Sequence, residues 1–146
     1  MAFVKEVCVT VKSVIQNLAG GIPYGEDEVT EAIVFGFMKP TENGFFLTYS
    51  EDGEGGKTVS DVTVDGERVT VRRRGAVESE MVFAMGETHT SLYEIPPYRF
   101  DMKITATKIR NTLTLGSGGL DLFYKMELGG AEKKVRLRLF VHPKEG

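Results

Sequence analysis

The chain has 146 residues, a mass of 16.1 kDa, a formal net charge of −3 and a pI near 5.5. This length predicts a single domain over residues 1–146, large enough to bury most of its apolar surface without disulfides. The negative net charge gives no overall attraction to phosphate backbones, so we expect no nucleic-acid partner.

The cysteine content and the N-terminal residues bear on the compartment. Cys8 is the single cysteine, which excludes an internal disulfide and favours a reducing environment. The opening residues do not have the apolar core of a signal peptide, and no run approaches the roughly 18 apolar residues of a membrane span. We therefore expect a cytoplasmic protein without a membrane partner.

The first segments in chain order predict a strand and a loop. Val7, Val9 and Val11 alternate with polar or small residues, and the alternation slips near Ser13, which predicts a β-bulge there. The segment 16–27 contains several Gly residues and a Pro, so it predicts a loop.

The next strand, residues 29–38, is apolar on both faces in its second half. One face holds Val29, Glu31, Ile33, Phe35 and Phe37, and the other holds Ala32, Val34, Gly36 and Met38. We assign the face of Glu31 to the interior. The opposite face, around Ala32, Val34 and Met38, is then expected to be covered by a partner or by a second copy of the chain.

A β-hairpin over residues 62–71 is the clearest local signal. Apolar residues alternate on both sides of Asp65-Gly66, a pair typical of a type I′ turn. Counting on by twos from Val69 and Val71 places Arg73 on the apolar face. A guanidinium is thus predicted among side chains that avoid water.

Alternation recurs in the remaining segments, 45–49, 88–95, 100–106, 120–128 and 135–141, with Gly, Pro and Asn between many of them. No amphipathic helical window is longer than a turn or two. The sequence therefore predicts an all-β fold: a single closed antiparallel meander β-barrel of about 8–10 strands, since closure removes the exposed edges of a long meander.

Several short motifs also carry a family resemblance. They include Gly36-Phe37, Leu47-Thr48-Tyr49-x-Glu51, Val71-x-Arg73-x-Gly75, Ser91-x-Tyr93, Leu122-x-Tyr124 and the single residues Glu31 and Thr107. In this pattern the chain resembles the YwiB-like family of bacterial proteins, a domain of unknown function. The resemblance implies a calycin-like barrel, the architecture of lipocalins and fatty-acid-binding proteins, and it implies no activity, ligand or cofactor.

Arg73 and Glu31 are the first candidate site residues, because both are predicted to face the interior. A buried guanidinium needs a carboxylate, carbonyls or an anionic ligand to satisfy its donors. Two interpretations stay open. Glu31 and Arg73 form a structural ion pair, or Arg73 binds the carboxylate or phosphate of a small anionic amphiphile whose apolar tail lies among aromatic and Met side chains.

Tyr49, Tyr93, Tyr124 and His89 are the other candidates on inward faces. The tyrosines either line a polar pocket or fill core volume and bond a carbonyl at a barrel end. His89 shares its strand face with Ser91, which does not by itself make a catalytic pair. No histidine lies at metal-ligand spacing from another histidine or from Cys8, so we expect neither a metal nor another cofactor.

Three functions remain as hypotheses. The first is a small-molecule binding protein with Arg73 as the anion-binding residue. The second is a packed barrel that acts as an interaction or homodimer module. The third is an enzyme with a site at the barrel mouth that uses Tyr, Glu and His89; no sequence motif supports it specifically, so no catalytic residue is assigned. The outward cations Arg72, Arg74, Arg136 and Arg138 are predicted to be solvated surface charge.

Overall fold

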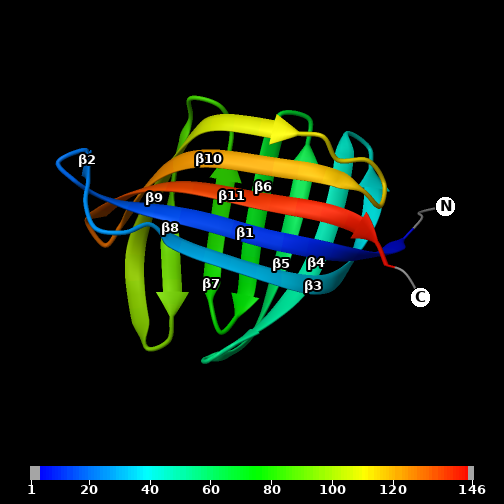
Figure 1. Cartoon of the computed structure of the whole chain (residues 1–146), viewed down its shortest axis with the longest axis horizontal. Helices are drawn as coiled ribbons and strands as arrows, with labels where there is room; N and C mark the ends of the chain where they lie inside the picture. The colour runs from blue at the N-terminus through cyan, green and yellow to red at the C-terminus, as the bar shows by residue number, and fades with distance from the viewer. Residues whose placement is uncertain (1–3, 145–146) are drawn as a thin grey trace.

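The computed structural model describes residues 4–144, which form β-strands joined by turns (Figure 1). The strands are β1 (Lys5–Ala19), β2 (Ile22–Pro23), β3 (Glu28–Thr41), β4 (Gly44–Gly53), β5 (Gly56–Asp65), β6 (Arg68–Gly75), β7 (Glu78–Phe83), β8 (Thr88–Ile95), β9 (Tyr98–Asn111), β10 (Gly118–Leu128) and β11 (Ala131–Pro143). No helix long and apolar enough to cross a membrane occurs among these residues.

The strands form one antiparallel sheet that closes on itself. Each long strand from β3 to β11 pairs with its sequence neighbour, and β1 pairs with both β3 and β11. The β1–β11 register runs from Val7 opposite Pro143 to Leu18 opposite Glu132, so the first and last strands are joined over most of their length. The two-residue β2 adds only to the end of β1. The predicted closed antiparallel meander barrel is confirmed.

Alternate residues of the long strands fill the barrel. Val7, Val62, Val71, Phe83 and Ile104 are among those with at most 1% of their surface exposed. Burying a side chain of this size contributes about 1.5–3 kcal/mol relative to leaving it in water, so this packing holds the sheet closed. The 62–71 hairpin forms as predicted, with Val64 opposite Val69 and Gly66 at a positive φ of 60°.

The orientation of β3 is opposite to the prediction. Gly36 and Met38 are buried, whereas Glu31 is exposed on the outer face. The reason lies in the pairing with β1: Gly36 stands opposite Val7 and so shares its inward face. The predicted inward placement of Glu31 is therefore wrong, and so is an outer surface built on Ala32, Val34 and Met38.

The predictions for β1 also need correction. The strand continues through Ala19 into the expected loop, and its pairing with β11 and β3 shows no shift at Ser13. Ser13 stays in the inward phase, and its hydroxyl lies 2.7 Å from the Thr30 hydroxyl on β3. A polar pair at the solvent-exposed opening of the barrel, rather than a bulge, accounts for the break in the apolar pattern.

Strand β3 leaves β4 at Gly36. The two strands pair only from Gly36 to Thr41, so residues 28–35 of β3 pair with β1 and have no partner on the other side within the described chain. A Cβ at Gly36 would overlap the Thr48 carbonyl oxygen and lie 3.0 Å from the Tyr49 Cβ. The absence of a side chain thus allows the close approach at the point where the strands part.

We expect Gly36→Ala to lower the free energy of unfolding by about 1–3 kcal/mol, the usual cost of forcing extra volume into a packed site. Gly53→Ala is the matched control, because a Cβ there would meet only the Gly56 carbonyl oxygen at 3.8 Å. Urea unfolding measures both. Equal stability of the two variants would contradict the close approach at Gly36.

Candidate functional site

A row of inward-facing residues crosses five strands at the level where β3 leaves β4. Tyr49 on β4 stands opposite Ser60 on β5, Ser60 opposite Arg73 on β6, Arg73 opposite Ser79 on β7, and Ser79 opposite Tyr93 on β8. Tyr49 and both serines are buried, whereas Arg73 and Tyr93 are half-buried. The row places a cation beside phenol and hydroxyl groups at the edge of an otherwise apolar core.

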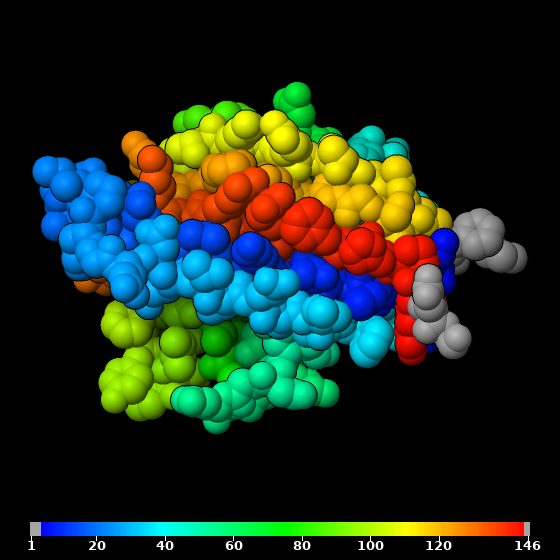
Figure 2. All heavy atoms as spheres, viewed as in Figure 1, coloured from blue at the N-terminus to red at the C-terminus, as the bar shows by residue number. Residues whose placement is uncertain are grey.

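Arg73 lies in a pocket of about 280 Å³ that opens between β3 and the β4–β5 hairpin. Figure 2 shows a recess below β3 at this place, with the green atoms of the middle strands lying deeper. The lining residues are Val11, Ser13, Thr30, Glu51, Asp52, Gly53, Thr58, Ser60, Arg73, Val77 and Leu137. The gap left by the departure of β3 is therefore an entrance to one end of the barrel interior.

No side chain of residues 4–144 forms a hydrogen bond or an ion pair with Arg73. The predicted Glu31–Arg73 ion pair does not form, because Glu31 lies on the outer face of β3. Glu51 lines the same pocket, but its carboxylate oxygens are not within the 4.0 Å of the Arg73 nitrogens that an ion pair requires. The guanidinium donors are thus open to the pocket.

Burial and the charge of Arg73 act in opposite directions on two neighbouring tyrosines. Burial raises the pKa of Tyr124 to about 12, partly offset by the positive charge of Arg73, while Tyr93 adds to the increase. Burial also raises the pKa of Tyr49, against the charge of Arg73; the Glu51 carboxylate raises it further and the Ser60 hydroxyl lowers it. Both phenols therefore remain neutral hydrogen-bonding groups near the guanidinium at pH 7.

His89 lies apart from this pocket. It is half-buried on the inner face of β8, opposite Ile104, and its Nε2 atom is buried without a hydrogen-bond partner among the described residues. Strands β7 and β8 pair only at Glu78–Glu94 and Ser79–Tyr93, so they diverge beside His89. The structure thus groups Arg73 with the three predicted tyrosines and leaves out both Glu31 and His89.

Four polar residues near Arg73 were missed by sequence reasoning. Glu51 lies beside acidic and Gly-rich residues at the end of β4, and it continues the alternation of Leu47 and Tyr49. Thr58 and Ser60 precede Val62 in the same phase on β5. Ser79 shares the inward phase of Met81 and Phe83 on β7, and its buried hydroxyl has no hydrogen-bond partner within residues 4–144. They could have been found by extending the period-two alternation of each strand beyond its apolar residues.

The pocket combines a cation with hydroxyl acceptors and donors. Arg73 can bind a carboxylate or phosphate through paired N–H donors, and Glu51 can accept a hydrogen bond from an N–H or O–H group of the same molecule. No group of three or more His, Cys, Asp or Glu side chains within the described part of the chain is placed to hold a metal ion.

Together the fold and the pocket define a closed antiparallel β-barrel with a polar recess at one opening. The chain belongs to the family described as Domain of unknown function (DUF1934), whose model matches residues 10–139. It is 28% identical over 125 residues to the uncharacterized beta-barrel protein YwiB of Bacillus subtilis (strain 168), covering 86% of this chain and 84% of that one.

The fold agrees with that of a solved relative. The crystal structure of ywiB protein from Bacillus subtilis matches with a TM-score of 0.85 and 25% identity, covering 97% of this chain and 94% of the other. The predicted resemblance to the YwiB-like family is confirmed, and the family and this relative are described without a specific function.

The two buried tyrosines give a pH-dependent prediction. Their folded pKa values lie above the value of about 10 in an unfolded chain, so their contribution to stability is complete below pH 10 and is lost at higher pH. For Tyr124 the loss extends as the pH rises towards its folded pKa of about 12. Tyr124→Phe is expected to reduce this alkaline loss, measured by urea unfolding at several pH values. The same slope in Tyr124→Phe and wild type would contradict the assignment.

Proposed function

We propose that this protein is a cytoplasmic binding protein whose pocket at Arg73 holds a small anionic molecule. The observation that carries the proposal is the half-buried guanidinium of Arg73, which has no partner among residues 4–144 and lies in a pocket open to solvent. A cation removed from water without a compensating charge costs several kcal/mol, so a chain that keeps one at such a position favours a use in binding.

The hydroxyl of Ser79 supports the same proposal. It stands opposite Arg73 in the strand register and has no hydrogen-bond partner among residues 4–144. A buried hydroxyl left unpaired costs about 1–3 kcal/mol, and a ligand or an ordered water at Arg73 would offer it an acceptor. Two unsatisfied groups in one row favour a bound polar molecule more strongly than either does alone.

The pocket dimensions limit the ligand. Its volume of about 280 Å³ is near the lower end of small-molecule sites, and packed core residues fill the barrel beneath it. Val11, Val77 and Leu137 supply the apolar part of its lining. We expect a carboxylate or phosphate with a short apolar portion and with hydroxyl or amino groups for Glu51.

Arg73→Met separates this function from a structural role. We expect the variant to lose the rise in melting temperature that organic carboxylates and phosphates produce in wild type, while its unliganded stability stays equal or increases because an unpaired cation is removed. Arg72→Met, on the exposed outer face of β6, is the control and should keep the ligand response. Differential scanning fluorimetry over a panel of such acids gives both readouts.

Two outcomes would count against the binding function. One is a panel in which no carboxylate or phosphate raises the melting temperature of wild type. The other is a strong destabilisation of unliganded Arg73→Met alone, which would assign Arg73 to holding the fold together.

A second function, self-association through β3, is favoured by a different observation. Val29, Ile33, Phe35 and Phe37 project from the outer face with 59%, 68%, 64% and 49% of their surface exposed. They lie on or next to the stretch 28–35 whose edge has no strand partner. An antiparallel second copy of this stretch would satisfy the open backbone groups and extend both sheets about a two-fold axis.

We expect wild type to form dimers that Ile33→Lys converts to monomers, because a charge would replace an apolar contact at the two-fold axis. Met85→Lys is the control, since Met85 is 57% exposed and lies in the turn between β7 and β8. Light scattering after size-exclusion chromatography measures the mass. A wild type that is monomeric over the whole concentration range would exclude this function.

A further inference from the structure

The outer faces of four adjacent strands carry a dense group of cations. Three neighbouring cross-strand rows on β1, β11, β10 and β9 contain Lys12, Lys108, Arg110, Lys125, Lys134, Arg136 and Arg138, which we call the basic face. Within these rows Asp121 is the single carboxylate. The whole chain has a net charge of −3, so positive charge is strongly concentrated on this one side of the barrel.

A β-bulge in β9 is needed for this arrangement. The β9–β10 register shifts between Phe123 and Tyr124, and Thr107 is the extra residue, with its hydroxyl donating to the Phe123 carbonyl at 3.1 Å. Without the bulge, strict alternation would place Thr107 outward and Lys108 in the inward phase of Ala106. The bulge instead turns Lys108 and Arg110 to the outside. It also explains Thr107, whose place in the family pattern had no structural reason in the sequence.

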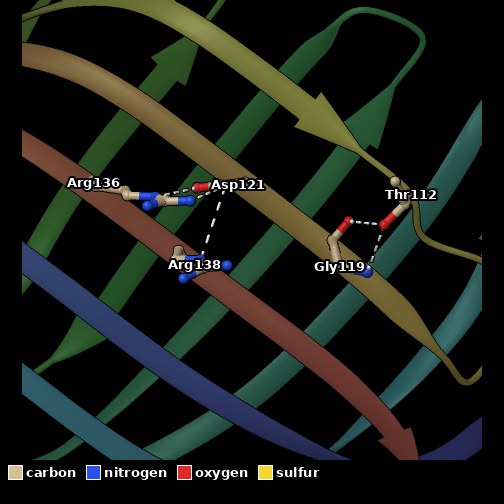
Figure 3. A network of polar contacts seen from close by, with 5 residues as sticks. All are labelled: Thr112, Gly119, Asp121, Arg136 and Arg138. Atoms are coloured by element: carbon tan, nitrogen blue, oxygen red, sulfur yellow. Dashed lines mark hydrogen bonds and ion pairs between the residues drawn. The ribbon is translucent and has the colours of Figure 1, made fainter.

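Asp121 orders the centre of the basic face (Figure 3). Arg136 donates to both of its carboxylate oxygens, from Nε at 3.1 Å and from Nη2 at 2.8 Å, and the Arg138 Nε atom lies 3.8 Å from the Oδ2 atom. The hydrogen bond from Arg136 lowers the pKa of Asp121, with the charges of Arg136, Arg138 and Arg110 acting in the same direction. One carboxylate therefore holds Arg136 through two hydrogen bonds, forms an ion pair with Arg138, and leaves most of the positive charge of the basic face uncompensated.

Three cations of the basic face lie over phenylalanine rings. The Arg136 guanidinium lies 4.6 Å from the Phe123 ring centre, Lys108 lies 5.6 Å from the same ring, and Arg138 lies 4.8 Å from the Phe140 ring centre. Such contacts restrain long side chains that would otherwise lose conformational entropy on binding a partner. The Arg138 Nε atom is also buried without a hydrogen bond among the described residues. The cations are thus partly ordered before any partner binds.

We propose that the basic face binds single-stranded nucleic acid through its phosphates. A chain of phosphates matches cations spread over several rows, and a flexible strand can follow a convex sheet. The face has no projecting helix to enter a duplex groove, and its phenyl rings lie under cations instead of being free to enter a lipid bilayer. The proposal is independent of the pocket at Arg73, which lies inside the barrel.

The opposite expectation from the sequence has a physical reason. Net charge excludes a partner only when charge is spread evenly. Along the sequence the cations of the basic face are divided among separate strands, with Lys134, Arg136 and Arg138 on β11. Closure of the barrel brings β1 and β9 to either side of the β10–β11 pair and adds Lys12, Lys108 and Arg110 to the same surface. The basic face therefore exists only in the folded barrel.

The test measures binding of a labelled oligouridine by fluorescence anisotropy at several salt concentrations. An RNA of about 20 nucleotides exceeds the roughly 4–16 that one small β-domain covers. We expect the double variant Lys108→Gln/Arg110→Gln to weaken binding about tenfold at low salt. We also expect the slope of log K against log salt concentration to become about 1.4 less steep, or about 0.7 per lost phosphate contact. Arg72→Gln/Arg99→Gln removes the same charge elsewhere and should bind within about twofold of wild type.

Three results would overturn the proposal. The first is a wild type that does not bind the RNA, or binds it without salt dependence; this result needs no variant to fold. The second is equal weakening by the two double variants, which would reflect net charge alone, provided that both melt at the wild-type temperature. The third is sedimentation with phosphatidylserine vesicles in the absence of RNA binding, which would assign the face to membranes.

Discussion

The pairing of β1 with β11 joins the two ends of the sheet, and it gives the strands an inside and an outside. The register fixes which residues of β1 face inward, and β1 in turn fixes β3 through pairs such as Val9–Val34. It also places β1 beside β11 and, through β10, close to β9. Both the buried core and the outer basic face therefore depend on the same set of backbone hydrogen bonds.

The second constraint is the length of β3 relative to β4. A strand paired on both sides throughout would seal the barrel wall, whereas β3 leaves β4 at Gly36 and opens the wall beside Arg73. Arg73 continues the inward phase of β6 just beyond the apolar core, at the level of this opening. The guanidinium is thus half-buried and still reachable from solvent, which is the combination that an anion-binding site needs.

Local pattern was sufficient for the fold and for Arg73. The Asp65-Gly66 turn and the alternation on either side of it fix the phase of β6 without reference to other strands. The inward face of β3 can be assigned only from its pairing with β1, because both faces of the strand are apolar. The sequence pattern of β3 alone therefore places Glu31 on the wrong face. The bulge at Thr107 likewise depends on the register with Phe123, so no pattern within β9 could show that Lys108 points outward. Glu51 was missed because the acidic and Gly-rich residues at the end of β4 are typical of a loop.

The binding site depends on Arg73 lying inside the barrel opening with no charged partner among residues 4–144. Electron density from a crystal of the purified protein would show its position. We expect the guanidinium in the pocket, bound to water or to an anion beside Ser60 and Ser79, with the Glu51 carboxylate too far away for an ion pair. A two-pronged Arg73–Glu51 ion pair, or a guanidinium turned to the outer surface, would contradict it.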